Sequence, residues 1–522
     1  MIEEAIELLG IEKVLTNGDL LPYQKNLTGL NRDIIAVFKP DSVEEIRKIV
    51  LLANQYKTSL YPISTGKNWG MGSKLPVQNN CVLLDLGSLN KIRSVDIKLG
   101  VAVIEPGVTQ RQLSDHLSSI SAPFFLDVTG SGSDTSVIGN TIERGIAYNS
   151  ERVSQIINLE ILTGNGEILK TGFAGSENNL VKDLYRYGIG PAIDGLFFQS
   201  NFGIILSATF SLFAIPEYQV SFTVSLTDTK QLLSAVNVFS ELLRDKVIDG
   251  IPHIFDKNRF LSLATPALYQ KLLATHKNID ATETEKVLEK ITLGEWFIGG
   301  TIMGKKKIVK ARIACMRQAM NGIAQPRFMG TGNNFALKTI MRLFQMKHQL
   351  ALMEATASLK HLNSGRPTDI IIKSIYWPSQ KTNCNLENKE PDNSEAGLKI
   401  LNILCPMRGA DVETLLTILQ TIKEKYGLFI ATSLNGISFR CLEIVITIFF
   451  SKSNETETEK AHQCVNAICS QLAQAGFPQF RSGIETMHLI VDEKTTFWQT
   501  VKKLKNLFDS NNIISPGRYN SL

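Results

Sequence analysis

The spacing of apolar and polar residues over the first 63 positions predicts a strand, a helix and a second strand. Ile34–Phe38 is a short apolar run of the kind that forms a buried strand. Ser42 and Glu45 have the spacing of a capping box, which marks the start of a helix. Apolar residues then recur at helical spacing, at Ile46, Ile49, Val50 and Ala53. Because a second apolar run ends at Ile63, residues 34–63 are expected to form a β-α-β unit. A short amphipathic helix is predicted before it, over residues 2–15.

The same pattern continues to about Pro216, where a first domain is expected to end. Further strands are predicted at 81–86, 101–105, 156–163, 167–171 and 202–213, and helices after the capping residue Thr109 and at 191–199. Asn165-Gly166 separates two of these strands and is a strong hairpin signal.

Beyond residue 216 the pattern changes to alternating runs, as at 220–225, mixed with longer helical periods. Helices are predicted at 229–244, 305–322, 459–475 and 494–508, with a strand at Leu442–Phe450 and a polar surface loop at 379–396. This mixture indicates an α+β domain built on an antiparallel sheet.

Composition places the chain among ordinary globular proteins. The 522 residues are 43% hydrophobic and 20% charged, with a net charge of +5, so two large domains are expected and a nucleic-acid partner is not. The seven cysteines form no CxxC pair and are expected to be reduced thiols, while the seven histidines have no metal-ligand spacing. The N-terminus lacks the features of a signal peptide, and no apolar run is long enough to span a bilayer. We therefore expect a cytoplasmic location.

The stretch from Tyr61 to Gly72 carries the first chemical signal. A β-prone run ends in Ser64, Thr65 and Gly66, and two more glycines follow. Such a segment can turn sharply and present successive backbone N–H groups to a pyrophosphate, although a plain Gly-rich turn has the same composition. Neither a P-loop nor a G-x-G-x-x-G motif fits the order of residues here. The Gly- and Ser-rich stretch from Thr129 to Asn140 has the same two interpretations.

Six blocks agree in type and order with one family, and they span almost the whole chain. They are Ser64–Gly72, Val103–Gly107, Val137–Gly145, Asp194–Gly203, Pro478–Arg481 and Asn512–Arg518. In these blocks the chain resembles the vanillyl-alcohol oxidase / p-cresol methylhydroxylase (4-cresol dehydrogenase) flavoproteins.

The resemblance implies a two-domain α+β flavoprotein: an FAD-binding domain (1–216), an antiparallel-sheet cap domain for the substrate (217–476), and a C-terminal segment (477–522) that folds back on the flavin. It also implies the cofactor contacts. These are Ser64, Thr65, Gly66, Lys67, Asn68, Trp69, Gly70, Gly72, Pro106, Gly132, Ser136, Val137, Gly139, Asn140, Thr141, Gly145, Ser200, Asn201, Gly203, Ile204 and Arg518.

Three positions depart from the family pattern. Members that act on para-substituted phenols hold the phenolate with two tyrosines and one arginine; here Met71 and Phe480 match the tyrosines, and only Arg481 remains. A buried anion needs its donors, so a simple 4-hydroxybenzyl substrate is not expected. Leu398 matches the residue that bonds covalently to the flavin in many members, so FAD is expected to be non-covalent. Glu443 aligns near the histidine pair of the oxidases and is expected in the substrate pocket.

Several single residues keep two interpretations. Arg481 is expected to face the substrate, with a surface ion pair as the alternative. Asp134 is a candidate acid/base beside the flavin or an ordinary loop residue, and Lys67 either contacts the pyrophosphate or is exposed.

The expected function is that of an FAD-dependent oxidoreductase. It takes hydride from an activated C–H bond of a small aromatic or natural-product substrate onto flavin N5, and then passes electrons to oxygen or a carrier. The alternatives are a 2-hydroxy-acid dehydrogenase-like activity and a flavin-binding protein without turnover. A homodimer is possible by resemblance, and neither a nucleic acid, a membrane nor a metal is expected as a partner.

Overall fold

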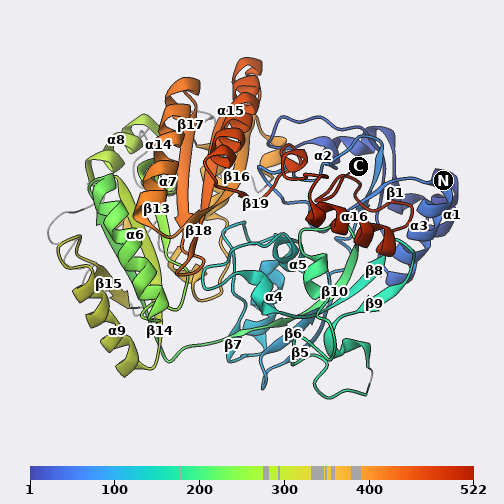
Figure 1. Cartoon of the computed structure of the whole chain (residues 1–522), viewed down its shortest axis with the longest axis horizontal. Coiled ribbons are helices and arrows are strands. Elements are labelled where there is room, and N and C mark those ends of the chain that lie inside the picture. Colours follow the sequence, from blue (N-terminus) through green and yellow to red (C-terminus); the bar gives the residue numbers. More distant parts are fainter. Residues whose placement is uncertain are drawn as a thin grey trace.

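The structure, a computed structural model, describes residues 1–176, 178–273, 281–291, 294–330, 346, 350–353, 359–377 and 390–521. Two lobes are visible (Figure 1). The N-terminal lobe comprises residues 1–214, and the sheet lobe comprises the elements that build one large sheet from residue 218 onward. The predicted boundary at 216 falls between the last strand of the first lobe and the first strand of the second.

The N-terminal lobe contains two main sheets. The first has the order β1 (Val14–Leu15), β2 (Ile34–Phe38), β4 (Cys81–Asp85), β3 (Leu60–Ile63), and the second has the order β5 (Ile92–Asp96), β6 (Val101–Ile104), β10 (Gly203–Ser211), β8 (Ile156–Thr163), β9 (Ile168–Lys170). A small pair joins β7 (Phe124–Phe125) to β11 (Phe213–Ala214). The helices of this lobe are α1 (Ile2–Leu9), α2 (Leu21–Gln24), α3 (Val43–Tyr56), α4 (Gln110–Ser119) and α5 (Val137–Ile142).

The predicted β-α-β unit is present, with one addition that sequence periodicity does not reveal. β2 and β3 are parallel, but β4 lies between them and pairs with both. The Ser42 hydroxyl caps α3 by accepting from the backbone N–H of Glu45 at 3.3 Å, as the capping box predicts. The hairpin around Asn165-Gly166 is also confirmed, as β8 and β9.

Two predicted helices of this lobe are wrong in extent. The helix over residues 2–15 ends at Leu9, because Gly10 adopts a φ of 89° that does not continue a helix. The helix over 191–199 is only a 3-10 turn at Asp194–Phe197. Gly190, Pro191 and Gly195 interrupt that segment, and glycine and proline disfavour a continuous helix.

The sheet lobe is built on eight antiparallel strands. Their order is β15 (Arg327–Gly330), β12 (Tyr218–Leu226), β14 (Trp296–Gly304), β13 (His253–Asp256), β17 (Phe429–Asn435), β18 (Cys441–Ser451), β16 (Ala396–Pro406), β19 (Gln479–Arg481). The helices of this lobe are α6 (Thr229–Arg244), α7 (Lys257–Leu273), α8 (Ala281–Ile291), α9 (Lys306–Ala319), α12 (Leu359–Leu362), α13 (Ile370–Tyr376), α14 (Gly409–Tyr426) and α15 (Glu455–Gln474).

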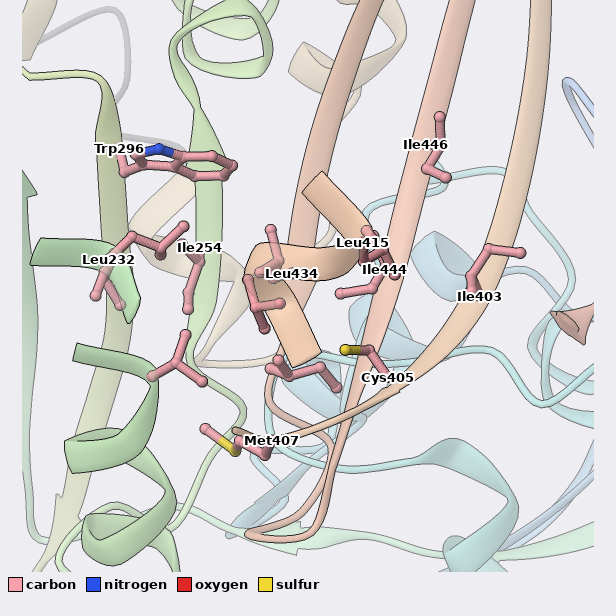
Figure 2. Close-up of a cluster of buried hydrophobic side chains, with 14 of the residues drawn as sticks. Leu232, Ile254, Trp296, Ile403, Cys405, Met407, Leu415, Leu434, Ile444 and Ile446 are labelled. Atoms are coloured by element: carbon pink, nitrogen blue, oxygen red, sulfur yellow. The ribbon is translucent and has the colours of Figure 1, made fainter. Parts of the chain in front are cut away.

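The two faces of this sheet differ in chemistry. On one face, alternate residues such as Ile254, Leu434 and Ile444 form an apolar core with the helices that cover them (Figure 2). The residues between them along the strands, such as His253, Asn435 and Glu443, point to the opposite face. Part of the opposite face, around Leu398, Ala431 and Phe449, packs in a second, smaller apolar cluster, and the same face also lines a cavity.

The C-terminal segment returns to the N-terminal lobe, where α16 (Thr496–Phe508) lies against it (Figure 1). The ring of Phe508 packs on Phe197 and Phe202, with centroid distances of 5.4 and 5.8 Å. The buried Lys505 ammonium donates to Asp509 at 2.6 Å and to the Ile514 carbonyl at 2.7 Å. These contacts anchor the segment that follows the helix.

Among the described residues, no helix combines the length and apolar character that a membrane crossing requires. Most of the predicted surface loop at 379–396 lies outside the described residues, and β16 begins at its end.

Candidate functional site

The glycine loop lines a groove in the N-terminal lobe through residues 64–68. Gly66 has a φ of 66°, which glycine adopts without steric cost, and this lets the chain turn directly after β3. Within the described part of the chain, the backbone N–H groups of Thr65, Gly66, Lys67 and Asn68 donate to no protein acceptor. Successive free donors beside a strand end are suited to binding an anion.

The remaining walls of the groove come from segments far apart in the sequence. The second Gly- and Ser-rich loop is braced by buried Gln110, which accepts from the Thr129 N–H at 2.8 Å and donates to the Gly132 carbonyl at 2.9 Å. The walls include Pro106, Ser136, Gly139, Asn140, Ser200, Asn201, Gly203, Ile204 and Arg518, all of them among the expected cofactor contacts. About 1070 Å³ within the groove is free of protein atoms, part of it open to solvent.

These features fit the pyrophosphate and the elongated shape of FAD. The free N–H groups would hold the phosphates directly, and Gly139 has no room for a side chain, since a Cβ there would lie 2.4 Å from the Ser64 Oγ. The residues that would hold the cofactor are therefore those of the glycine loop, the second loop and the start of β10.

Seven of the expected contacts do not line this groove: Trp69, Gly70, Gly72, Gly132, Val137, Thr141 and Gly145. Gly70 and Gly72 instead allow close packing against other parts of the chain. A Cβ on Gly70 would lie 2.7 Å from Ile400 of β16, and a Cβ on Gly72 would lie 2.7 Å from Ile484. Val137 and Thr141 are buried in the lobe, whereas Trp69 and Gly145 line a second cavity.

A buried ionic cluster lies at one end of the groove. Arg518 forms an ion pair with Glu143 and donates to the Tyr61 hydroxyl at 2.6 Å, while Tyr519 donates to Glu143 at 3.1 Å. Burial alone would raise the pKa of Glu143, but Arg518 and Arg481 beside it hold the pKa below its ordinary value. The resemblance identified Arg518 but not its carboxylate partner, which lies within a matched block and carries no local signal of its own.

The second cavity lies on the polar face of the eight-stranded sheet. Its floor includes a row of polar side chains across five neighbouring strands: His253 on β13, Asn435 on β17, Glu443 on β18, Asn402 on β16 and Arg481 on β19. Asn402 and Asn435 donate to the two oxygens of Glu443 at 2.6 and 2.9 Å. Burial raises the pKa of the Glu443 carboxyl, against the opposing effect of the two amides and Arg481.

Arg481 belongs to both cavities, because its side chain lines the groove and the second cavity alike. Its Nη2 donates to the Asn68 Oδ1 at 2.6 Å, and its Nε lies 3.9 Å from Glu143. Nε is buried without a hydrogen-bond partner among the described residues. The guanidinium is thus held in place and keeps a donor for a bound molecule.

The other expected site residues are divided between the cavities and the rest of the chain. Met71, Leu398 and Glu443 line the second cavity, and Lys67 lines both cavities while paired with Glu390. Phe480 and Asp134 line neither cavity. The Asp134 carboxylate instead pairs with Arg111 at 2.8 Å, in a partly exposed position.

Comparison with known proteins agrees with this geometry. The family model of an FAD binding domain matches residues 34–172. The chain is 29% identical to 1'-carboxy-chondrochloren decarboxylase of Chondromyces crocatus, over 98% of this chain and 95% of that protein. It is 23% identical to the flavoprotein subunit of 4-cresol dehydrogenase [hydroxylating] of Pseudomonas putida, over 98% and 93%. The crystal structure of p-cresol methylhydroxylase with substrate bound superposes with a TM-score of 0.84 at 22% identity, covering 100% of this chain and 96% of that one.

Proposed function

We propose that this chain, a member of the vanillyl-alcohol oxidase / p-cresol methylhydroxylase family of FAD-linked oxidoreductases, takes hydride from an activated C–H bond of a small organic substrate. FAD supplies the hydride-accepting chemistry, and oxygen or an electron carrier then receives the electrons. The chain's own residues bind the substrate, orient it and exclude water.

The observation that carries this proposal is the continuity of the two cavities. Five residues line both of them: Lys67, Asn68, Ser131, Asn140 and Arg481. The groove suits a dinucleotide, and the second cavity has apolar walls with a few polar groups, which is typical of a small-molecule site. A substrate in the second cavity would reach the shared wall and, through it, a cofactor held in the groove.

Arg481 is proposed to bind the polar or anionic end of the substrate near the reacting carbon. Asn68 fixes the guanidinium by accepting from Nη2, and Glu143 compensates part of its buried charge. A fixed cation at this position stabilises negative charge that develops as hydride leaves, and it acts more strongly on the transition state than on ground-state binding.

The lining of the second cavity is unfavourable for a simple para-alkylphenol as the substrate. Met71 is buried in the wall of the second cavity and offers no hydroxyl donor. A phenolate there would be bound by Arg481 but would lack the hydrogen bond that a tyrosine at this position donates. We infer a larger aromatic or natural-product substrate with an acidic or polar group.

A second candidate reaction is decarboxylation coupled to the oxidation. The similarity over almost the full length to a protein named as a decarboxylase of a carboxylated molecule favours it. In this reaction hydride leaves the activated carbon, the adjacent C–COO⁻ bond breaks, and its electron pair forms a C=C bond as CO₂ departs. The hydride accounts for the two electrons of the oxidation.

One experiment separates these functions. The FAD-loaded protein is mixed without oxygen with phenols, benzylic alcohols, aryl-substituted carboxylic acids and 2-hydroxy acids, and bleaching of the flavin absorbance near 450 nm is followed. Bleaching by an aryl substrate supports the proposal, and release of CO₂ in the same mixture supports the decarboxylating variant. Bleaching by 2-hydroxy acids alone contradicts the proposal in favour of a hydroxy-acid dehydrogenase, and no bleaching by any class supports a flavin-binding protein without turnover.

A further inference from the structure

A second arginine lines the second cavity and forms no ion pair with a carboxylate of the described residues. Arg259 lies in the first turn of α7, directly after β13. Its Nε is buried and has no hydrogen-bond partner among the described residues. Burial lowers the pKa of its guanidinium, and Tyr148 and Asp256 offset this only in part.

The nearest carboxylate in sequence is engaged elsewhere. Asp256 Oδ1 accepts from the backbone N–H of Arg259 at 2.7 Å, and Asp256 Oδ2 lies 3.3 Å from the Lys423 ammonium. Asp256 therefore fixes the start of α7 and pairs with a lysine, and the Arg259 side chain keeps its donors. A partly buried guanidinium without an anion is costly, so a site of this kind is completed by a bound one.

Two further polar groups lie at the same end of the cavity. The Tyr148 ring, from the N-terminal lobe, packs 4.6 Å from the His253 ring. Asn435 donates to Glu443 through Nδ2, so its Oδ1 faces the His253 Nδ1, 2.8 Å away, and that nitrogen carries the proton. Burial lowers the pKa of His253 to about 4, so the ring is neutral at pH 7 and adds no charge to the cavity.

The charges of the cavity favour an anion. Among the described residues that line it, Glu443 is the only acid, and both of its oxygens accept from asparagine amides rather than from arginine. Arg259 and Arg481 are therefore both available to a ligand. The strands that lead to them, β13 and β19, are four strand spacings apart in the sheet, which is about 19 Å.

We propose that Arg259 binds a carboxylate of the substrate at the end of the cavity remote from the cofactor groove. Arg259 lines only the second cavity, whereas Arg481 lines both. The substrate class is therefore an elongated aryl carboxylic acid whose reacting carbon lies near Arg481 and whose acidic group lies several bonds away, at Arg259. This inference rests on the proposed function, which it extends to the substrate.

Equilibrium binding tests the inference without turnover. The probes are aryl carboxylates of increasing chain length, from phenylacetate to 8-phenyloctanoate, each paired with its methyl ester. Dissociation constants are measured by titration calorimetry on the FAD-loaded protein. Above a threshold chain length, the acid is expected to bind about 10- to 100-fold more tightly than its ester, the gain of a charge-assisted contact. In Arg259→Met this preference disappears, in Arg259→Lys part of it returns, and in Arg481→Met it persists for the long acids.

Two results would overturn the inference. One is an Arg259→Met protein with normal FAD content and thermal stability that keeps the acid preference of the wild type. The other is a wild-type protein that binds every acid and its ester equally, which decides the matter even where the Arg259→Met protein fails to fold. Failure of the proposed oxidation has a different signature, since it leaves the binding preference intact but gives no flavin bleaching with any probe.

Discussion

At the level of single side chains, Arg481 has the most direct connection to chemistry, because it lines both cavities and is held by Asn68. We predict that Arg481→Met leaves FAD bound but slows flavin reduction by the substrate on the order of 10²–10³-fold, the usual effect of removing one transition-state donor. Stopped-flow absorbance under anaerobic conditions measures this rate. Arg440→Met, at an exposed position in the loop before β18, is the matched control. A wild-type rate in Arg481→Met would remove this residue from the site.

A second residue, Asp392, predicts how stability depends on pH. It is buried and accepts from the Ser73 hydroxyl at 2.7 Å, and burial raises its pKa to about 6. Since the folded state binds the proton more tightly than the unfolded state, stability decreases as the pH rises from about 4 to 6 and is then constant with respect to this group. Asp392→Asn should abolish this contribution and raise the free energy of unfolding at pH 7 by up to about 3 kcal/mol.

Denaturant unfolding at pH 4, 5, 6 and 7 checks this sign. Asp115→Asn, at an exposed position on α4, is the control. An Asp392→Asn profile parallel to that of the wild type would show that the buried carboxyl does not titrate in this range.

At the level of elements, the glycine loop contacts the sheet lobe as well as the groove. The Gly70 carbonyl accepts from the Ile400 N–H of β16 at 2.9 Å, and Gly70 has a φ of 73°. We predict that Gly70→Val both strains the backbone, by about 1–2 kcal/mol, and pushes β16 away from the loop. The expected result is a lower melting temperature together with a lower ratio of FAD to protein.

Gly18→Val is a suitable control, because a Cβ on Gly18 would meet no atom within 4 Å. Full flavin occupancy and an unchanged melting temperature in Gly70→Val would mean that the loop and β16 are not coupled.

The elements that the sequence predicted well are those whose signals are local. The Ser42 capping box and the Asn165-Gly166 turn depend on a few adjacent residues, and the structure contains both. The insertion of β4 between β2 and β3 depends on pairing between distant strands, which periodicity does not encode. The helix predicted at 191–199 was wrong because the low helix propensity of its glycine and proline residues prevails over its apolar spacing.

The candidate site also contains residues that a local sequence signal predicts and residues that only the folded structure brings together. Residues 64–68 follow from a local pattern of glycine and hydroxyl side chains after a strand, and they line the groove. His253 and Arg259 had no local signal, because their importance arises from the position of β13 in the sheet and from Tyr148 of the other lobe. Gly70 and Gly72 were recognised as special, and the close contacts they permit in the structure are with Ile400 and Ile484.

At the level of the whole molecule, the second cavity has walls from both lobes and bears on how FAD is held. Leu398, which the resemblance aligns with a flavin-linking residue, is buried in the wall of the second cavity and has no nucleophilic atom. We predict that FAD is bound non-covalently and that acid precipitation releases all of it. The measurement is the flavin absorbance of the supernatant against that of the redissolved pellet, and colour in the pellet would reveal a covalent link through another residue.

Because the C-terminal segment returns to the groove, the cofactor site is completed only late in the synthesis of the chain. The glycine loop leaves the ribosome early, but the groove receives Ile514, Ser515 and Arg518 only after more than 440 further residues have been translated, as the positions of Asn68 and Arg518 show. We therefore expect flavin capture to follow translation of the segment around Arg518. Fragments that stop before this segment are expected to hold less FAD per chain than the full chain, which their flavin absorbance would report.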